Sequence, residues 1–205
     1  NRDEGQRSNG MILSYDRLEE TAGIAYRNGN GDICINERIK PLDLSQIPFP
    51  YRDLEEFSNR IIYYESSRGC PYRCSYCLSS VDKRLRLRDI EKVRAELEFF
   101  LDRNVPQVKF IDRTFNCDHS HAMGIWQFIK ENDNGVTNFH FEIAADLLTD
   151  DELDFLAELR PGQVQFEAGI QTTNPETLKA INRTMDISKV RSIVSRIRQA
   201  GNIHI

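Results

Sequence analysis

The chain has 205 residues, of which 40% are hydrophobic and 29% are charged, and its formal net charge is −5. This composition is typical of a globular protein with enough residues for one sizeable core. The net charge argues against binding of nucleic acid through a basic surface, and we find no signal peptide and no apolar stretch long enough for a membrane span. We therefore expect no nucleic-acid partner and no membrane span.

Both ends of the sequence suggest a piece of a longer protein. The chain begins at Asn1 without a methionine, and it ends in an apolar alternation, Asn202-Ile203-His204-Ile205, that resembles the first half of a strand. We expect residues 1–58 to form a linker and β-hairpin segment after a missing N-terminal domain. Residues 59–205 are expected to form one (βα) domain that is truncated at its C-terminus.

The first fifty residues contain one predicted hairpin between irregular stretches. Residues 1–10 are polar and predict a linker or disorder, and residues 11–20 give a weak helix signal. Residues 23–36 alternate at period two around Asn28-Gly29-Asn30-Gly31, which supplies the positive-φ residues of a tight turn and so predicts a β-hairpin. Three prolines within residues 41–50 predict a stiff connector without regular structure.

Strands and amphipathic helices alternate from residue 59 onward. The predicted strands are residues 61–64, 108–111, 139–143 and 164–168, with a fifth beginning at 202. Four predicted helices follow the capping residues Asp89, Asp118, Thr149 and Asn174, and one more ends at Gly201. This order is typical of an α/β fold with a parallel sheet and right-handed crossovers. The sequence has no Gly-x-Gly-x-x-Gly and no phosphate loop, so a nucleotide-binding sheet is disfavoured against a barrel.

Three of the five cysteines stand close together after the first strand of this pattern. Cys70, Cys74 and Cys77 have the spacing C-x3-C-x2-C, on a loop that leaves the C-terminal end of strand 61–64. Thiolates are soft ligands that one short loop can aim at a metal centre. Three of them do not close a structural zinc site, which usually has four ligands, and they leave one iron of a 4Fe-4S cluster open. A zinc loop with a fourth ligand elsewhere and a set of plain buried thiols are the alternatives.

The cysteine pattern does not resemble a disulfide framework, so we expect a reducing, cytoplasmic location. The two remaining cysteines, Cys34 and Cys117, are expected to be core or surface thiols.

With Tyr76 directly before the third cysteine, the motif resembles the radical SAM superfamily, and the resemblance spans roughly residues 61–205. It implies a partial TIM-like barrel of about four to five βα units, with the site at the C-terminal ends of the strands. It also implies that the three thiolates hold a 4Fe-4S cluster whose open iron binds S-adenosylmethionine. A small-molecule substrate and an electron donor such as flavodoxin or ferredoxin are the implied partners.

Two further segments resemble the cobalamin-associated branch of that family, which includes proteins similar to the anaerobic magnesium-protoporphyrin monomethyl ester oxidative cyclase. They are Ile111-Asp112-Arg113-Thr114-Phe115, where many members have two glycines and an acid, and residues 166–183. The resemblance implies cobalamin in a preceding domain that this chain lacks. The implied cofactor-binding residues are Tyr76, Asp112, Glu142, Glu167 and Gln171.

Plainer roles remain open for several of these residues. Asp112 can be a capping acid, Glu142 can be solvated or paired with a helix residue, and Arg183 can bind the cofactor carboxylate or pair with an acid. The basic run at residues 83–88 predicts a solvated face or, alternatively, a docking surface for an anionic substrate or a reductant.

The resemblance implies an oxidoreductase-type enzyme that cleaves S-adenosylmethionine reductively to a 5′-deoxyadenosyl radical. That radical would functionalise a C–H bond of an unidentified substrate, with tetrapyrrole cyclisation and cobalamin-dependent methylation as open outcomes. One alternative is a non-catalytic iron–sulfur electron-transfer protein in which Cys117 supplies a fourth ligand. Another is a binding module that zinc stabilises.

Overall fold

A computed structural model describes residues 15–37, 39–54, 57 and 60–205. The chain divides into two compact units, residues 1–42 and residues 43–205. This division places most of the proline-rich connector with the second unit, where Leu44 is buried. The polar stretch 1–10 and the first part of the weak helix signal lie outside the described residues, and the expected preceding domain stays a prediction.

The first unit contains the predicted hairpin. β1 (Ala25–Arg27) pairs antiparallel with β2 (Ile33–Ile35), and a short 3-10 helix, η1 (Tyr15–Glu20), precedes them. The side-chain oxygen of Asn28 accepts the backbone N–H of Asp32 at 2.9 Å, which closes the turn. The period-two alternation therefore predicted this element correctly.

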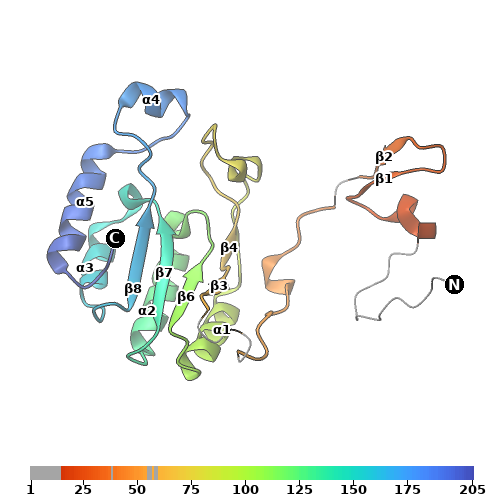
Figure 1. Cartoon of the computed structure of the whole chain (residues 1–205). Coiled ribbons are helices and arrows are strands. Elements are labelled where there is room, and N and C mark those ends of the chain that lie inside the picture. Colours follow the sequence, from red (N-terminus) through yellow and green to blue (C-terminus); the bar gives the residue numbers. More distant parts are fainter. Residues whose placement is uncertain (1–14, 38, 55–56, 58–59) are drawn as a thin grey trace. The chain divides into compact units, whose positions relative to one another are not determined.

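Four parallel strands form the central sheet of the second unit, in the order β3-β6-β7-β8 (Figure 1). Their bounds are β3 (Ile62–Tyr64), β6 (Gln107–Phe110), β7 (Asn138–Ile143) and β8 (Val164–Ala168). The predicted fifth strand is present only as one isolated parallel bridge between Gln165 and His204. The parallel α/β architecture is thus confirmed, and within the described residues the sheet is open rather than a closed barrel.

Helices alternate with these strands along the chain, and most of them cover one face of the sheet (Figure 1). Their bounds are α1 (Ile90–Asp102), α2 (His119–Glu131), α3 (Asp150–Ala157), α4 (Pro175–Ala180) and α5 (Ile187–Ala200). α4 lies apart from the others, beyond the C-terminal ends of the strands. None of the helices in the described ranges combines the length and apolarity that crossing a membrane demands.

The helix boundaries follow the predicted caps. Each of the four capping side chains accepts a backbone N–H from the first turn of its helix: Asp89, Asp118, Thr149 and Asn174. Thr149 and Glu152 form a complete capping box, in which the backbone N–H of Thr149 donates to Glu152 Oε2 at 2.8 Å. α5 ends at Gly201, whose φ of 74° lies in the left-handed region that glycine adopts without strain.

Alternation along the strands separates a buried face of the sheet from an open face. The residues that face the helices are fully or nearly fully buried: Ile62, Val108, Phe110, Phe139, Phe141, Val164 and Phe166. Burying such a side chain stabilises the fold by roughly 1.5–3 kcal/mol, so this layer makes the largest contribution to the core. The positions between them are Tyr63, Lys109, His140, Glu142, Gln165 and Glu167, and the pleat turns these toward the open face.

Arg88 attaches the connector to the second unit. A short 3-10 helix, η2 (Leu44–Gln46), interrupts the connector where no regular structure was predicted, because Asp43 caps it. Arg88 is 7% exposed, and its Nη2 donates to the carbonyl oxygen of Ile47 at 2.9 Å. Its Nε donates to Glu96 Oε2 at 2.8 Å, so this end of the basic run is buried and neutralised rather than solvated.

Candidate functional site

The cysteine loop leaves the C-terminal end of β3 and is closed at its base by a small ladder. β4 (Ser67–Arg68) pairs antiparallel with β5 (Arg86–Leu87), and the three cysteines lie between these strands in the chain. The ladder was not predicted, because two residues a strand are too few to show an alternating pattern. Gly69 has a φ of +102°, and an added Cβ would lie 2.1 Å from the carbonyl oxygen of Arg84. Only glycine therefore lets the two sides of the loop approach this closely.

Asp112 anchors the beginning of this loop. It is fully buried, and its Oδ1 and Oδ2 accept the hydroxyl of Ser66 at 2.7 Å and the backbone N–H of Ser66 at 3.1 Å. Burial raises the pKa of Asp112 to about 6, while hydrogen bonds from Ser67 and Ser66 act in the opposite direction. The sequence analysis expected Asp112 to bind the cofactor. Its carboxylate does not line the cavity beside the cysteine loop, because both of its oxygens accept hydrogen bonds from Ser66 in the loop.

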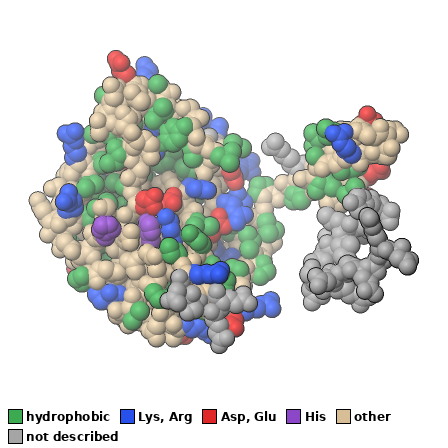
Figure 2. Space-filling view, viewed as in Figure 1, with side chains coloured by type: hydrophobic (Ala, Val, Ile, Leu, Met, Phe, Trp, Pro, Cys, Tyr) green, Lys and Arg blue, Asp and Glu red, His purple; other side chains and the backbone are tan. Residues whose placement is uncertain are grey.

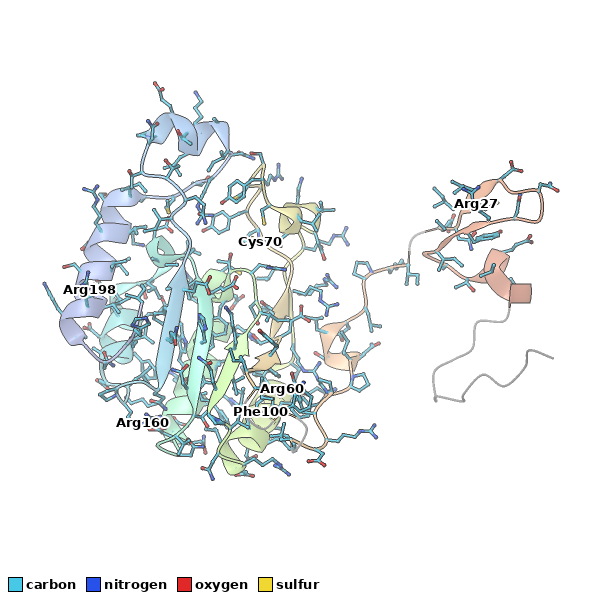
Figure 3. All side chains as sticks on the ribbon, in the orientation of Figure 1. Arg27, Arg60, Cys70, Phe100, Arg160 and Arg198 are labelled. Atoms are coloured by element: carbon cyan, nitrogen blue, oxygen red, sulfur yellow. The ribbon has the colours of Figure 1, made fainter. Side chains whose placement is uncertain are left out.

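A cavity of about 220 Å³ lies between the cysteine loop and the ends of β7 and β8. Figure 3 shows Cys70 near the C-terminal ends of the parallel strands, at the opposite end of the unit from Phe100. All the other predicted site residues line this cavity: Cys70, Cys74, Cys77, Tyr76, Glu142, Glu167 and Gln171. Cys70 and Cys74 are buried and Cys77 is half-buried, so the thiols face the cavity more than the solvent.

The C-terminal end of α4 holds the cysteine loop from the other side of the cavity. The backbone N–H of Ser75 donates to the carbonyl oxygen of Ile181 at 2.9 Å. The side-chain amide of Asn182 donates to the carbonyl oxygen of Arg73, also at 2.9 Å. These two bonds fix the middle of the loop against a segment that lies more than a hundred positions later in the chain.

Arg183 reaches from this segment to the sulfur atoms. Its Nη1 lies 3.7 Å from Cys74 Sγ and 3.4 Å from the hydroxyl oxygen of Tyr76, and its Nη2 donates to the carbonyl oxygen of Gly169. One expectation from the sequence was that Arg183 pairs with an acidic residue. Within the described residues, Arg183 instead bonds these sulfur and oxygen atoms. A guanidinium is a suitable charge-assisted donor to a thiolate, so Arg183 can compensate charge at Cys74.

Charged side chains gather on the open face of the sheet beside the cavity, as Figure 2 shows. Lys109 Nζ lies 3.0 Å from Glu167 Oε2, and His140 Nε2 lies 3.3 Å from the same oxygen without the alignment of a hydrogen bond. The hydrogen bond from Lys109 lowers the pKa of Glu167. Glu142 lies opposite Glu167 in the strand register, and burial together with the charge of Glu167 raises the pKa of Glu142.

Gln171 completes the wall of the cavity through an unusual backbone conformation. Its φ is 60°, in the left-handed region, and its side chain folds back over Gly169. An added Cβ on Gly169 would lie 2.7 Å from Gln171 Nε2. The missing side chain at Gly169 therefore leaves room for the amide of Gln171 in the cavity wall.

The three cysteine thiols line the same cavity, but their sulfur atoms are not arranged around one metal position. In the part of the chain that the structure describes, no three His, Cys, Asp or Glu side chains are arranged to hold a metal ion. Cys70 Sγ lies 3.6 Å from Thr114 Oγ1, whose hydroxyl donates to the carbonyl oxygen of Arg113, and Arg183 is a donor to Cys74 Sγ. Three soft donors on one loop fit a cluster that leaves a coordination position for another molecule.

Cys117 differs from the three loop cysteines. It ends the short 3-10 helix η5 (Phe115–Cys117) and is half-buried. Burial, with Cys70 nearby, raises the pKa of Cys117 to about 11, so the free chain holds it as a protonated thiol near neutral pH. Its raised pKa disfavours the thiolate form, which is the form that binds a metal.

Sequence reasoning did not single out Lys109 or Thr114. Lys109 stands between the buried residues Val108 and Phe110, so the alternation already indicates that it lies on the open face. Its contact with Glu167 depends on the strand order, because β7 separates the two strands, and one sequence does not give that order.

Comparison with known proteins gives one family and several relatives. Residues 64–204 match the family model of the radical SAM superfamily. The chain is 30% identical over 125 residues to an uncharacterized methyltransferase of Pyrococcus horikoshii, a match that covers 56% of this chain and 27% of the relative. It is 27% identical over 203 residues to the anaerobic magnesium-protoporphyrin IX monomethyl ester cyclase of Synechocystis sp., covering 92% of this chain and 39% of the relative. The chain thus spans well under half the length of these relatives.

A solved structure shares the fold. It is that of the radical S-adenosylmethionine methyltransferase TsrM from Kitasatospora setae with cobalamin and a 4Fe-4S cluster bound. The TM-score is 0.59 at 19% sequence identity, and the match covers 69% of this chain and 27% of that chain. The likeness supports the same strand and helix arrangement over most of the second unit.

Proposed function

The chain belongs to the radical SAM superfamily, and on that premise we propose that Cys70, Cys74 and Cys77 bind a 4Fe-4S cluster at which S-adenosylmethionine is cleaved. The observation that carries the proposal is the single cavity lined by all three thiols, at the strand ends where α/β barrels carry their sites. When bound, the cluster supplies one electron that splits S-adenosylmethionine into methionine and a 5′-deoxyadenosyl radical, which takes a hydrogen atom from the substrate.

The residues around the thiols have the chemistry that a bound cluster needs. Thiolate ligands carry negative charge, and Arg183 is a cationic donor beside Cys74, while the hydroxyl group of Thr114 lies beside Cys70. The ladder at the base of the loop and the hydrogen bonds to Ile181 and Asn182 hold the loop in place. The three sulfurs therefore need to move only a little to bind one cluster. The protonated thiol of Cys117 supports a three-cysteine site over a cluster closed by a fourth cysteine.

The acidic wall of the cavity is suited to the polar groups of S-adenosylmethionine, which carries an ammonium group, a sulfonium and ribose hydroxyls. Lys109 keeps Glu167 ionised, so that its carboxylate accepts hydrogen bonds from such groups. The amide of Gln171 both donates and accepts, and Glu142 stands beside Glu167 on the neighbouring strand. Tyr76 borders the same cavity from the loop. We assign these four side chains to cofactor binding.

The second part of the proposal concerns the reaction on the substrate. The relatives named above include methyltransferases and an oxidative cyclase, which supports C–H functionalisation by methylation or cyclisation. We propose an oxidoreductase-type reaction on a small molecule in a reducing cytoplasm, with cobalamin, where it takes part, held by another domain of the protein. No disulfide joins any of the five cysteines within the described residues, which suits such a compartment.

The experiment that tests this function uses the chain reconstituted with iron and sulfide without oxygen. The reduced cluster should give an electron paramagnetic resonance signal that changes when S-adenosylmethionine is added, and 5′-deoxyadenosine should form. A cluster whose signal ignores S-adenosylmethionine would instead indicate an electron-transfer protein with a closed cluster. Stoichiometric zinc without iron after anaerobic purification would indicate a zinc-stabilised module.

A further inference from the structure

We propose that the substrate is an elongated acid with an apolar tail, and that it binds in a groove between the cofactor cavity and the proline-rich connector. The anionic group of the acid binds Arg113, and the tail lies in a pocket under the connector. The inference rests on the proposed function, because the C–H bond that reacts must lie beside the cofactor cavity.

The groove is continuous along the C-terminal ends of three neighbouring strands. A cleft of about 610 Å³ lies beside the cofactor cavity. Three residues line both the cleft and the cofactor cavity: Ser79, Arg113 and Glu142. Three others line both the cleft and a pocket of about 230 Å³: Tyr63, Glu65 and Ile111. Apart from Ser79, these residues belong to β7, β6 and β3 or follow them closely, and these strands are neighbours in the sheet. The cleft and the pocket together are called the substrate groove below.

The far end of the substrate groove is an apolar pocket under the connector. Its connector wall consists of Ile47, Pro48, Phe49, Pro50 and the following Tyr51. Opposite this wall, Tyr63 and Ile111 are 53% and 42% exposed. The two charged residues deep in the pocket, Arg88 and Glu96, are paired with each other. An apolar group that enters the pocket therefore covers exposed apolar surface and meets no unpaired charge.

Hydrogen bonds hold the connector over this pocket at two points. The hydroxyl of Tyr51 donates to the carbonyl oxygen of Tyr63 at 2.6 Å, and Arg88 Nη2 donates to the carbonyl oxygen of Ile47 at 2.9 Å. The Pro48-Phe49-Pro50 segment lies between these two points, and its prolines restrict the backbone further. The pocket is thus formed before a ligand arrives, which lowers the entropic cost of binding.

Arg113 supplies an unmatched positive charge at the other end of the groove. Most other charged residues of the cleft are already paired: Arg68 with Glu65, Asp82 with Arg86 and Lys109 with Glu167. Arg113 is exposed and forms no ion pair among the described residues, and the same holds for the half-buried Glu142. Glu142 is assigned above to the cofactor, whose ammonium group offsets its charge. The guanidinium of Arg113 is then left for an anionic group of the substrate, and its planar shape suits a carboxylate.

This arrangement also selects the part of the substrate that reacts. Because Arg113 lines both the cleft and the cofactor cavity, an acid bound there has its first carbon atoms beside the cofactor. The tail extends away from the cofactor, past Ile111 and into the pocket under the connector. We therefore expect the C–H bonds nearest the anionic group to be the ones that the enzyme functionalises.

The test measures the binding of three simple probes to the full chain by NMR titration, without cluster or S-adenosylmethionine. Octanoate has both features of the proposed substrate, butanoate lacks most of the tail, and octanol lacks the charge. We expect octanoate to bind one site at least tenfold more tightly than butanoate, because each CH₂ group that enters an apolar pocket contributes about fourfold. Octanoate should also bind about tenfold more tightly than octanol, because of its charged group.

Two variants separate the tail from the charge. Ile111→Gln should weaken octanoate binding by about tenfold and leave butanoate binding nearly unchanged. Arg113→Gln should weaken octanoate binding by about tenfold and leave octanol binding unchanged. If Ile111→Gln does not fold, Tyr63→Gln tests the same border of the pocket, and we expect the same loss.

Each variant has a matched control elsewhere on the unit. Val136 is 52% exposed but shortly precedes β7, at the opposite end of that strand from the groove. Figure 3 shows Arg198 on α5, on the far side of the unit from Cys70, and Arg198 is exposed. Val136→Gln and Arg198→Gln should leave the binding of all three probes unchanged.

Three results would overturn the proposal. The first is octanoate that binds no more tightly than butanoate or octanol. The second is octanoate binding that neither Ile111→Gln nor Arg113→Gln weakens. The third is an Arg113→Gln chain that, after reconstitution, binds S-adenosylmethionine more weakly but octanoate normally, because Arg113 would then hold the cofactor carboxylate. A chain that binds the probes as expected but does not cleave S-adenosylmethionine contradicts the proposed function and supports the groove as a site for such acids.

Discussion

Arg183 Nη1 lies 3.7 Å from Cys74 Sγ, although 109 positions separate the two residues in the sequence. The same guanidinium bonds Tyr76 on the cysteine loop and Gly169 after β8, so it spans the cavity. A cation beside one ligand sulfur stabilises added negative charge on a cluster, and hydrogen bonds to sulfur are among the factors that set a cluster's reduction potential.

Replacing Arg183 should therefore make the cluster harder to reduce. In Arg183→Gln we expect the midpoint potential to become more negative by on the order of 60 mV, which is a factor of ten for a one-electron couple. The measurement is a potentiometric titration followed by electron paramagnetic resonance, at unchanged iron content. Lys179→Gln is the control, since Lys179 is an exposed cation on α4, the helix that ends shortly before Arg183. Equal potentials in all three proteins would refute this role.

A methyl group at Gly69 should open the base of the cysteine loop. Its Cβ would lie 2.1 Å from the carbonyl oxygen of Arg84, and the backbone φ of +102° adds strain. Gly162→Ala is a matched control, because Gly162 also has a positive φ but open space around it. We expect Gly162→Ala to cost about 1–2 kcal/mol from strain alone and to leave iron binding intact. Gly69→Ala should cost more and reduce iron per chain; equal effects of the two changes would contradict the account of the loop.

The buried pair of Arg88 and Glu96 should be needed to hold the connector on the second unit. Their side chains are 8% and 10% exposed, and Tyr64 also donates to Glu96 at 2.6 Å. Glu96→Gln leaves the buried guanidinium without its counter-charge, so the free energy of unfolding should fall by about 3 kcal/mol. Chemical denaturation measures this change.

The surface pair of Arg94 and Glu91 on the same helix provides the comparison for Glu96→Gln. Its side chains are 38% and 72% exposed. Glu91→Gln should change the free energy of unfolding by less than about 1 kcal/mol. A loss as large as that of Glu96→Gln would show that burial is not the cause.

Asp112 should make stability depend on pH in a narrow window. Its pKa is raised from 3.8 to about 6 by burial, so between about pH 4 and pH 6 the folded chain keeps a proton that the unfolded chain has released. Stability from this group is therefore greatest below about pH 4 and is lost as the pH rises through 6. Relative to Asp112→Asn, the native chain should gain roughly 2–3 kcal/mol when the pH is lowered from 7 to 4. Denaturation curves at several pH values check this, and a constant difference between the two proteins would refute it.

The elements that local patterns determine were predictable from the sequence. The Thr149–Glu152 capping box begins α3 as expected, and β8 spans the predicted residues 164–168. The cysteine spacing and its position after a strand likewise indicated one loop at one end of the sheet. Each of these features depends on residues that are close together in the chain.

The contacts that the sequence did not predict join residues that are far apart in the chain, or residues whose surrounding sequence allows more than one interpretation. Asp112 bonds Ser66, 46 positions earlier, so nothing near it in the sequence indicates an anchoring role. Arg88 ends a run of cations that suggests a solvated face, whereas its partner Glu96 lies on the following helix. The position of Glu142 beside Glu167 became clear only from the strand register.

The central claim is that three thiols on one loop hold a cluster that activates S-adenosylmethionine. The most direct measurement is the yield of 5′-deoxyadenosine, with iron per chain, for Cys74→Ala after anaerobic reconstitution and reduction with dithionite. We expect about four iron atoms per chain and cleavage in the native protein, and both in the control Cys117→Ala. Cys74→Ala should lose cleavage and most of its iron. Undiminished 5′-deoxyadenosine formation by Cys74→Ala would contradict the claim.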